Sequence, residues 1–278
     1  NLMPKSLRLI WHFIDMFDIG SYWRIKKILN KEKPDLIITH NLKGIGYLIP
    51  LLIKGLNIKH IHYLHDIQLI HPSGIMIYNK EKVINSALAN LYSKICSRLF
   101  NSPSYVISPT AWLLEMHENK GFFKTSKKII MANPVLGKIT PAAANKKIKT
   151  DNNFYFIFLG QIEWHKGIIF LINVFEKFLN DNKALNCQLI IAGKGNLLSQ
   201  AKKIAKNNKI KFVGWRQNQI ENLLTIVDCL IIPSLCYENS PTVIPLAFAH
   251  GIPVLGSGIG GIKELLRHNR GILFEPGN

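Results

Sequence analysis

Short apolar runs alternate with helix-like segments along nearly the whole sequence, and this alternation limits the fold more than any other feature. Several of these runs are continuously apolar, as expected for strands covered on both faces. The strand candidates are 35–39, 58–64, 104–108, 128–131, 153–160, 187–193, 209–214, 228–234, 252–256 and 271–274. The pattern predicts an α/β fold with parallel sheets between layers of helices, in a doubly wound design.

One stretch interrupts the alternation and indicates a domain boundary. Residues 137–152, GKITPAAANKKIKTDN, are rich in Lys, Ala and Asn and have little periodic apolar content. We therefore predict an N-terminal unit over 1–140, a linker over 141–152 and a C-terminal unit over 153–278. In folds of this kind ligands bind at the carboxyl ends of the strands, so polar residues that follow each strand are the site candidates.

Both ends of the sequence look cut. The chain begins with Asn1 rather than methionine, has no signal-peptide pattern, and stops at Asn278 just after the strand-like run 271–274. We therefore expect a fragment of a longer protein.

The charge balance is strongly basic, with 35 Lys and Arg against 17 Asp and Glu and a formal net charge of +18. These residues are dispersed and form no block interleaved with aromatics, which disfavours DNA or RNA as partners. The charge suits an anionic membrane surface or a phosphorylated substrate, and solvated lysine faces explain it equally well. No run of 18 apolar residues appears, so we expect no membrane-spanning helix.

The cysteines argue against both disulfides and zinc. Cys96, Cys187, Cys229 and Cys236 lie far apart, without a C-x-x-C pair or metal-ligand spacing. They are typical of free thiols in a reducing compartment. We expect a cytoplasmic protein, touching the inner face of the membrane peripherally if at all, with no metal site.

A lysine at a predicted strand-to-helix turn is the first candidate for binding a ligand. In 161-QIEWHKGI-168, Lys166 places an ammonium group beside free backbone N–H groups, which suits a phosphate. Gln161 is a neutral donor at the strand tip. The alternative for Lys166 is a surface lysine at a helix start.

Two glycine-containing loops carry weaker signals. The loop 192-AGKGN-196 lacks the full three-glycine dinucleotide fingerprint, and a structural turn is the simpler interpretation of Gly193. In 213-VGWRQ-217, Trp215 and Arg216 are suited to stack on or flank a planar base, although a turn again suffices.

The segment 237-YENSPTVIPLAFAHG-251 combines a polar loop with a predicted helix. Ser240 resembles a helix N-cap and Pro241 a first helical residue. Glu238 would then offer a free carboxylate to sugar hydroxyls, beside N–H groups that face phosphate. The alternative is a carboxylate that interacts only with the helix dipole, worth about 0.3 to 1 kcal/mol.

Two further stretches follow predicted strands. In 255-LGSGIGGIKELL-266, closely spaced glycines allow backbone to approach a ligand, with Glu264 in the first helical turn. In 62-HYLHDIQLIHP-72, His65 is a hydrogen-bonding or proton-handling candidate that Asp66 could orient, and a purely structural pair is an equal alternative.

The order of these motifs resembles the retaining GT-B glycosyltransferases, which include bacterial mannosyl-, glucosyl- and N-acetylglucosaminyltransferases. The resemblance implies two Rossmann-like domains facing a cleft, with the nucleotide-sugar donor bound mainly by the second and the acceptor by the first. It implies a glycan or lipid-linked acceptor, no cofactor and no obligatory metal. The matching pieces are 34-PDLIITHN-41, 65-HD-66, 107-ISPT-110, 133-NPV-135, 159-LGQIEWHKG-167, 192-AGKGN-196, 212-FVGW-215, 232-IPSLCYENSP-241, 247-AFAHGIPVLGS-257 and 260-GGIKELL-266.

By this resemblance, Lys166 would neutralise the donor pyrophosphate, and Gln161 stands where the family often has arginine. Glu238 would hold the donor sugar with help from backbone N–H groups of Ser240 to Val243. His65 would reach toward that sugar. The remaining residues assigned to the donor site by resemblance are Gly193, Trp215, Asn239, Ser240, Pro241 and Thr242.

The sequence departs from the family pattern at the second carboxylate of the donor site. The family has a glutamate eight positions after the first, usually for the ribose hydroxyls, and here that position is Leu246, preceded by Pro245. Losing such a charged hydrogen bond costs about 1.5 to 3 kcal/mol, or roughly ten- to a hundredfold in affinity. Three explanations stay open: an impaired relative, a ribose held by another group, or a sequence error. We favour altered ribose contacts.

The family's first Gly-rich loop and its last C-terminal helices have no counterpart in the 278 residues. We therefore expect this fragment to be inactive or poorly folded by itself. The alternatives for the whole protein are a nucleotide-sugar epimerase, which 236-CYENSP-241 fits less well, and an impaired relative that only binds nucleotide-sugars.

Overall fold

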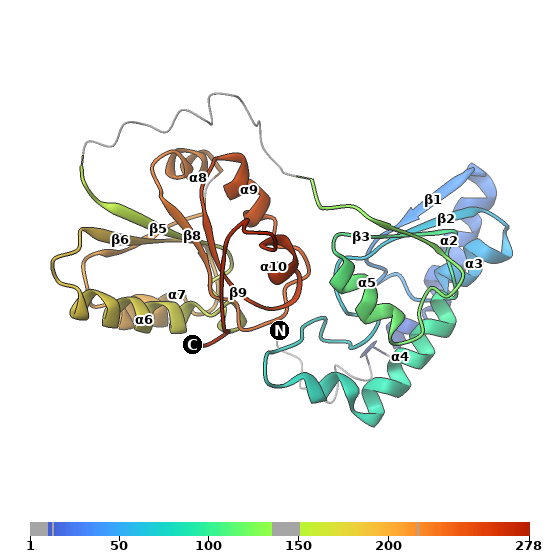
Figure 1. The fold of residues 1–278 in the computed structure, drawn as a ribbon. Coiled ribbons are helices and arrows are strands. Elements are labelled where there is room, and N and C mark those ends of the chain that lie inside the picture. The colour runs from blue at the N-terminus through green and yellow to red at the C-terminus, as the bar shows by residue number, and fades with distance from the viewer. Residues whose placement is uncertain (1–10, 13, 135–150, 216) are drawn as a thin grey trace. The chain divides into compact units, whose positions relative to one another are not determined.

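A computed structural model describes residues 11, 12, 14–134, 151–215 and 217–278. The chain divides into two compact units between Ala132 and Asn133. Each unit is built on one parallel sheet, which confirms the predicted α/β design with two Rossmann-like domains (Figure 1). Most of the predicted linker, 141–152, lies outside the described residues, so its boundaries stay a prediction.

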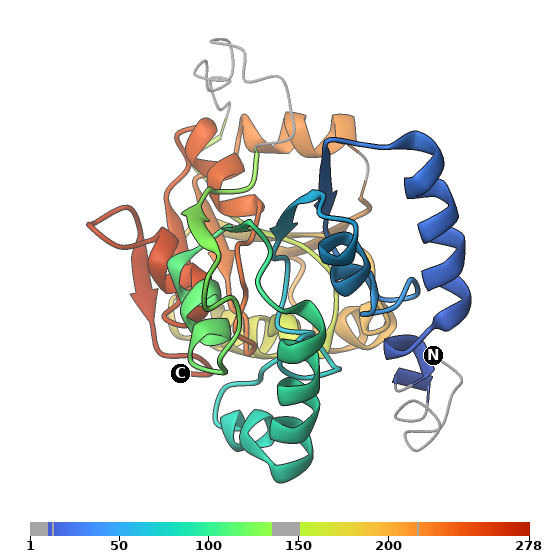
Figure 2. The same ribbon diagram turned by 90° about the vertical axis from the view of Figure 1, so that its right-hand side faces the viewer.

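Unit 1 contains a four-stranded sheet in the order β1-β2-β3-β4, in which each strand pairs in parallel with the next. Figure 2 shows α2, in blue, along one side of this unit. The elements are α2 (Ile19–Glu32), β1 (Leu36–Thr39), α3 (Ile49–Gly55), β2 (Lys59–Tyr63), η1 (Glu81–Asn85), α4 (Ala87–Phe100), β3 (Tyr105–Ser108), α5 (Ala111–Glu118) and β4 (Lys127–Ile130).

Short polar side chains set the starts of three helices in unit 1. Asp18 accepts a hydrogen bond from the backbone N–H of Ser21 at the start of α2. Ser86 and Thr110 accept from N–H groups three residues ahead at the starts of α4 and α5. Each cap satisfies an N–H group that has no partner inside its helix, so the local sequence determines where the helix begins.

The core of unit 1 contains several buried histidines. The Thr39 hydroxyl lies 2.7 Å from His60 Nε2 and 2.8 Å from His62 Nδ1. His117 is completely buried in α5, where its Nδ1 lies 2.8 Å from the Leu113 carbonyl oxygen. Burial lowers the pKa of His60 to about 4 and that of His117 to about 4, and it lowers the pKa of His62 as well. These three imidazoles are therefore neutral at neutral pH.

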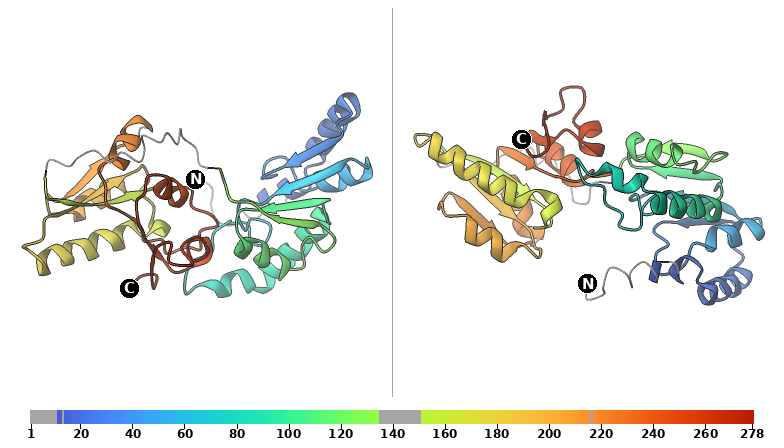
Figure 3. Two further views of the ribbon diagram at one scale, coloured as in Figure 1. Left: turned by 45° about the horizontal axis from the view of Figure 1, so that its top comes forward. Right: turned by 90° about the horizontal axis from the view of Figure 1, so that it is seen from below.

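Unit 2 contains a six-stranded parallel sheet in the order β10-β9-β8-β5-β6-β7. Helices α6 and α7 lie side by side on one face of it (Figure 3, right). The elements are β5 (Phe154–Leu159), η3 (Trp164–Lys166), α6 (Ile168–Asp181), β6 (Cys187–Ala192), α7 (Leu198–Ile204), β7 (Ile210–Val213), α8 (Gln217–Leu224), β8 (Cys229–Ile232), α9 (Val243–Ala249), β9 (Val254–Ser257), α10 (Gly260–Leu265) and β10 (Ile272–Phe274).

Successive residues of the central strands enter two separate hydrophobic cores. In β5, Ile157 and Leu159 pack toward α8, α9 and α10, whereas Phe158 packs toward α6 and α7. In β8, Leu230 likewise packs toward α8, α9 and α10, whereas Ile231 packs toward α6 and α7. Because side chains alternate across a strand and helices cover both faces, β5 and β8 are apolar at every position. This explains the continuous apolar runs in the sequence.

All ten predicted strands are present, each within a few residues of its predicted range. Helix α6 begins directly after Lys166 and Gly167, which confirms the predicted strand-to-helix turn. Within the described ranges, no helix has both the length and the hydropathy needed to cross a bilayer.

Candidate donor site

A cavity of about 560 Å³ opens at the carboxyl ends of the strands of unit 2. This volume lies within the range of small-molecule sites. Its polar lining comes from the residues after four strands: Gln161 and Lys166 after β5, Lys194 after β6, Trp215 after β7, and Ser234 and Glu238 after β8.

The sheet order explains why the cavity lies there. The chain leaves β5 for β6 and β7 on one side, and then returns to the other side of β5 to form β8. The connections after β5 and β8 therefore diverge from adjacent strands. A crevice at such a reversal is the usual ligand site of doubly wound sheets.

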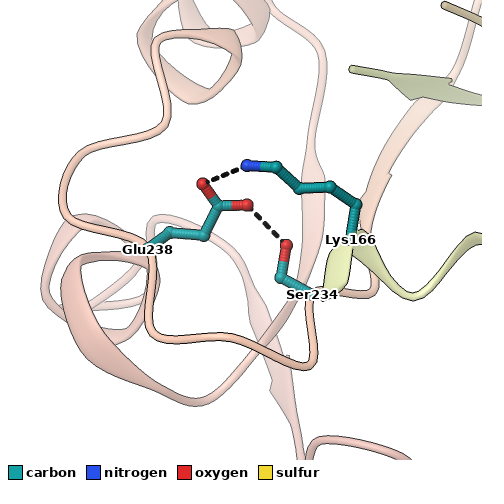
Figure 4. Close-up of polar contacts among 3 residues, drawn as sticks. All are labelled: Lys166, Ser234 and Glu238. Carbon is teal, nitrogen blue, oxygen red and sulfur yellow. Dashed lines mark hydrogen bonds and ion pairs between the residues drawn. The ribbon is translucent and has the colours of Figure 1, made fainter. Parts of the chain in front are cut away.

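Lys166 and Glu238 form an ion pair within the cavity (Figure 4). Lys166 Nζ lies 2.6 Å from Glu238 Oε2, and the Ser234 hydroxyl donates to Glu238 Oε1 over 2.6 Å. The exposed fractions of the two charged side chains are 22% and 13%, so water screens the pair only partly. The prediction of a free Glu238 carboxylate was therefore wrong, because both of its oxygens have partners.

The backbone that carries Lys166 is fixed by Gly167. This glycine has φ of 73°, and a Cβ atom there would lie 1.9 Å from the carbonyl oxygen of Pro233. The turn therefore requires glycine on two grounds. Leu235 N–H also donates to the His165 carbonyl oxygen over 2.9 Å, which joins the lysine turn to the loop that carries Glu238.

The glycine pair at the start of α10 positions the Glu238 loop. Gly261 N–H donates to the Glu238 carbonyl oxygen over 2.7 Å, and a Cβ atom at Gly261 would lie 1.9 Å from the Asn239 carbonyl oxygen. The glycines were predicted to let backbone approach a ligand, but what approaches them is the backbone of Glu238 and Asn239. Glu264 is the fifth residue of α10, so its predicted place in the first turn was wrong.

Substitution of Gly261 by alanine is expected to displace the Glu238 loop and to lower the free energy of unfolding by about 1–3 kcal/mol, as overpacking does. The added methyl group would meet backbone rather than a flexible side chain. Urea unfolding and nucleotide titration measure the two effects. Gly214→Ala is the matched control, because no atom lies within 4 Å of the added Cβ. Equal stability of the two variants would contradict the assigned role of Gly261.

Helix α9 begins later than the sequence predicted. Its first residue is Val243 and its N-cap is Thr242, whose side chain makes no capping hydrogen bond. The prediction of Ser240 as N-cap and Pro241 as first helical residue was therefore wrong. Ile244 N–H bonds the Pro241 carbonyl oxygen over 3.1 Å, so a turn precedes the helix proper. Ser240, Pro241 and Thr242 still line the cavity.

Backbone hydrogen bonds join the loops after β5 and β6. Gly160 N–H donates to the Ala192 carbonyl oxygen over 3.1 Å, and Ile162 N–H donates to the Lys194 carbonyl oxygen over 2.8 Å. A Cβ atom at Gly193 would lie 1.9 Å from the Gly160 carbonyl oxygen, so this position requires glycine for packing. Gly193 itself is outside the cavity lining, whereas its neighbour Lys194 is part of it.

Sequence reasoning missed Lys194 and Ser234. Lys194 lies between two glycines in a loop that was interpreted as a turn, and a serine at a strand end is too common to be selected. The signal that could have found them is their position directly after predicted strands.

Leu246 and Asn239 are the other predicted donor-site residues outside the lining. Leu246 is partly buried against the hydrophobic core formed with α8 and α10. The predicted role of position 246 beside the ribose therefore stays a prediction. Arg216 lies outside the described residues.

In unit 1, His65 lies at the carboxyl end of β2 against two other rings. His65 Nε2 is 2.8 Å from His40 Nδ1, so one imidazole donates to the other. The rings of His40, Tyr63 and His65 are mutually stacked, with centroids 5.0–5.5 Å apart. Partial burial, and then His40, lowers the pKa of His65. Asp66 Oδ1 accepts from Gln68 N–H over 2.7 Å, and the predicted orientation of His65 by Asp66 stays a prediction.

Two domain families account for almost the whole chain. The model of the Glycosyltransferase Family 4 domain matches residues 4–135, and that of the Glycosyl transferases group 1 domain matches residues 153–278. The chain belongs to the GT-B glycosyltransferases. The first match falls on the sheet that carries His65, and the second falls on the sheet with the Lys166–Glu238 cavity.

Relatives of this glycosyltransferase come from several organisms. An uncharacterized 42.6 kDa protein in the cps region of Klebsiella pneumoniae is 26% identical over 272 residues, which cover 96% of this chain and 69% of that protein. An uncharacterized glycosyltransferase of Methanocaldococcus jannaschii is 31% identical over 134 residues, or 46% of this chain and 33% of its own.

Solved structures share the fold of this glycosyltransferase. The crystal structure of Anabaena HepE in complex with UDP matches with a TM-score of 0.69 and 20% identity, covering 92% of this chain and 68% of that one. A further HepE structure contains UDP-glucose. The chain spans about two thirds of the length of HepE and of the Klebsiella protein.

Proposed function

We propose that the full-length protein transfers a hexose from a nucleotide-diphosphate sugar to a glycan or lipid-linked acceptor, with retention of configuration. The observation that carries the proposal is the Lys166–Glu238 pair in a cavity at the strand ends of unit 2. An ammonium group and a carboxylate side by side suit a donor with an anionic diphosphate next to a sugar rich in hydroxyls.

Charge develops on the diphosphate as the sugar leaves it, and a fixed cation there stabilises the transition state more than the ground state. Lys166 fills this role. Glu238 is acceptor-only when ionised, and its two oxygens retain lone pairs beyond the bonds from Lys166 and Ser234. It therefore binds sugar hydroxyls without moving far. His65 acts on the donor sugar by resemblance to the family, and we assign no protein nucleophile.

The relatives indicate which donors to test first. HepE was crystallised with UDP and with UDP-glucose, and the Klebsiella relative lies in a cps region. We therefore propose a UDP-hexose donor and a role in cell-envelope polysaccharide synthesis. A cytoplasmic site of action, with peripheral contact of the basic surface with anionic membrane, belongs to the same proposal.

The test is release of nucleotide by the full-length protein from UDP-, GDP- and ADP-hexoses with a mixture of glycan and lipid-linked acceptors. NMR of the product identifies the anomeric configuration. The proposal expects acceptor-dependent release of one nucleotide and the donor's own configuration in the product. Inversion would refute retention. Binding of donor without transfer would favour a binding module, and a changed sugar on intact nucleotide would favour an epimerase.

A binding module that has lost catalysis is the second candidate, since Leu246 stands where the family has its second glutamate and packs against the core. If position 246 faces the ribose, Leu246→Glu in the full-length protein is expected to raise donor affinity about tenfold, by one charged hydrogen bond. Calorimetric titration with UDP-glucose measures the change. Phe248→Glu, a partly exposed position of the same helix, is the control. No gain at 246 would refute the ribose contact.

A further inference from the structure

We propose that Lys194 supplies the second cationic contact to the donor diphosphate, from the loop after β6. The inference rests on the proposed function and adds a donor-binding residue to its site. It starts from Gln161, a neutral side chain at the tip of β5 that lines the same cavity. A diphosphate carries at least two negative charges, and Lys166 is the one cation of the β5 turn in the cavity lining.

The backbone places Lys194 next to Gln161. Ile162, the residue after Gln161, donates its N–H to the Lys194 carbonyl oxygen over 2.8 Å. The glycines on both sides of Lys194 pack closely against the β5 loop: added Cβ atoms would lie 1.9 Å from the Gly160 and 2.3 Å from the Ile162 carbonyl oxygen. The loops after β5 and β6 are therefore held together, and Lys194 of the β6 loop lies beside the neutral Gln161 of the β5 loop.

The charges in the cavity lining leave Lys194 available. Among the described residues, three charged side chains line the cavity: Lys166, Lys194 and Glu238. Lys166 and Glu238 form an ion pair, whereas the described residues show no ion pair or side-chain hydrogen bond for Lys194. Among the described lining residues, Lys194 therefore carries the positive charge that no carboxylate neutralises. An entering diphosphate meets this ammonium without displacing a protein partner.

The Lys194 side chain has no part in holding the loop. Its carbonyl oxygen accepts the bond from Ile162, and any residue at this position keeps that bond. The side chain is exposed apart from its place in the cavity lining. Lys194→Met therefore removes the charge and keeps both the stem length and the loop.

The experiment measures binding of inorganic pyrophosphate, and of UDP, GDP and ADP, to the full-length protein by calorimetric titration at low and high salt. Lys194→Met is expected to weaken the binding of pyrophosphate and of the preferred nucleotide about ten- to a hundredfold. The double variant Gln161→Arg/Lys194→Met is expected to recover most of the lost affinity, because it returns a second cation to the same diphosphate. Lys202→Met, an exposed lysine of α7 outside the lining, controls for net charge.

Four outcomes test this inference, and one of them separates it from the proposed function. Equal binding by wild type and Lys194→Met, or failure of wild type to bind pyrophosphate, overturns the inference. A Lys194-dependent binding of pyrophosphate without binding of any nucleotide supports the anion contact and refutes a nucleotide-sugar donor. A loss that Lys202→Met reproduces overturns it as well, because the effect is then one of net charge.

Discussion

Lys166→Met in the full-length protein is expected to lower kcat for hexose transfer by about a hundred- to a thousandfold, the usual effect of removing one preorganised group that stabilises developing charge. The Lys166 ammonium group forms an ion pair with the carboxylate of Glu238 and lines the cavity in which the diphosphate would bind. Its loss affects the leaving group most when the glycosidic bond is breaking. Initial rates of nucleotide release at saturating donor measure the change.

The same substitution leaves the Glu238 carboxylate without its ammonium partner in a mostly buried position. The double variant Lys166→Met/Glu238→Gln removes this unpaired charge, and should recover stability without recovering rate. Lys202→Met is the control for general loss of a lysine. A Lys166→Met enzyme that keeps more than a tenth of the wild-type kcat would contradict the role given to Lys166.

Acidification from pH 7 to pH 5 is expected to lower the free energy of unfolding of unit 1 by about 4 kcal/mol through His60 and His117 together, with a further loss from His62, whose pKa burial also lowers. Burial holds the pKa of His60 and of His117 to about 4, whereas an unfolded histidine titrates near 6.5. Between these values the unfolded chain binds more protons than the folded one, so stability falls with pH. The loss begins near pH 6.5, reaches about 2 kcal/mol per histidine at pH 5, and is complete near pH 4.

Urea unfolding at several pH values, with hydrogen exchange to identify the unit that opens, measures this effect. His117→Gln is expected to reduce the difference between pH 7 and pH 5 by about 2 kcal/mol, because one of the three buried histidines no longer titrates. His268→Gln, at an exposed histidine of unit 2, should leave the difference unchanged. Identical pH dependence of His117→Gln and wild type would refute the assignment.

The fold could be predicted from the sequence because short apolar runs rich in β-branched and aromatic residues recur between helical segments, as expected for strands covered on both faces. The ranges of β5, β6 and β8 followed directly from this pattern. The side-chain contacts at the site could not be predicted in the same way. Glu238 and Lys166 are 72 residues apart in the sequence, and only the return of the chain to the far side of β5 brings them together.

The errors at the site have a common physical cause. Ser240–Pro241 has the local chemistry of a helix start, but the loop is held instead by Gly260 and Gly261 of α10, about twenty positions further on. Tertiary contacts of this kind override local preference. His65 also has a partner that the local sequence does not reveal, because His40 follows a different strand.

The parallel arrangement of the six strands in unit 2 also determines where the molecule tolerates additions. The cavity is lined from the carboxyl ends of the strands, so the turns that enter the strands lie at the opposite edge of the sheet. The turn between α6 and β6, residues 182–186, is exposed at every position. A fluorophore or affinity tag inserted after Lys183 would stand a full strand length away from the donor, and ligand binding could be followed on an otherwise unaltered site.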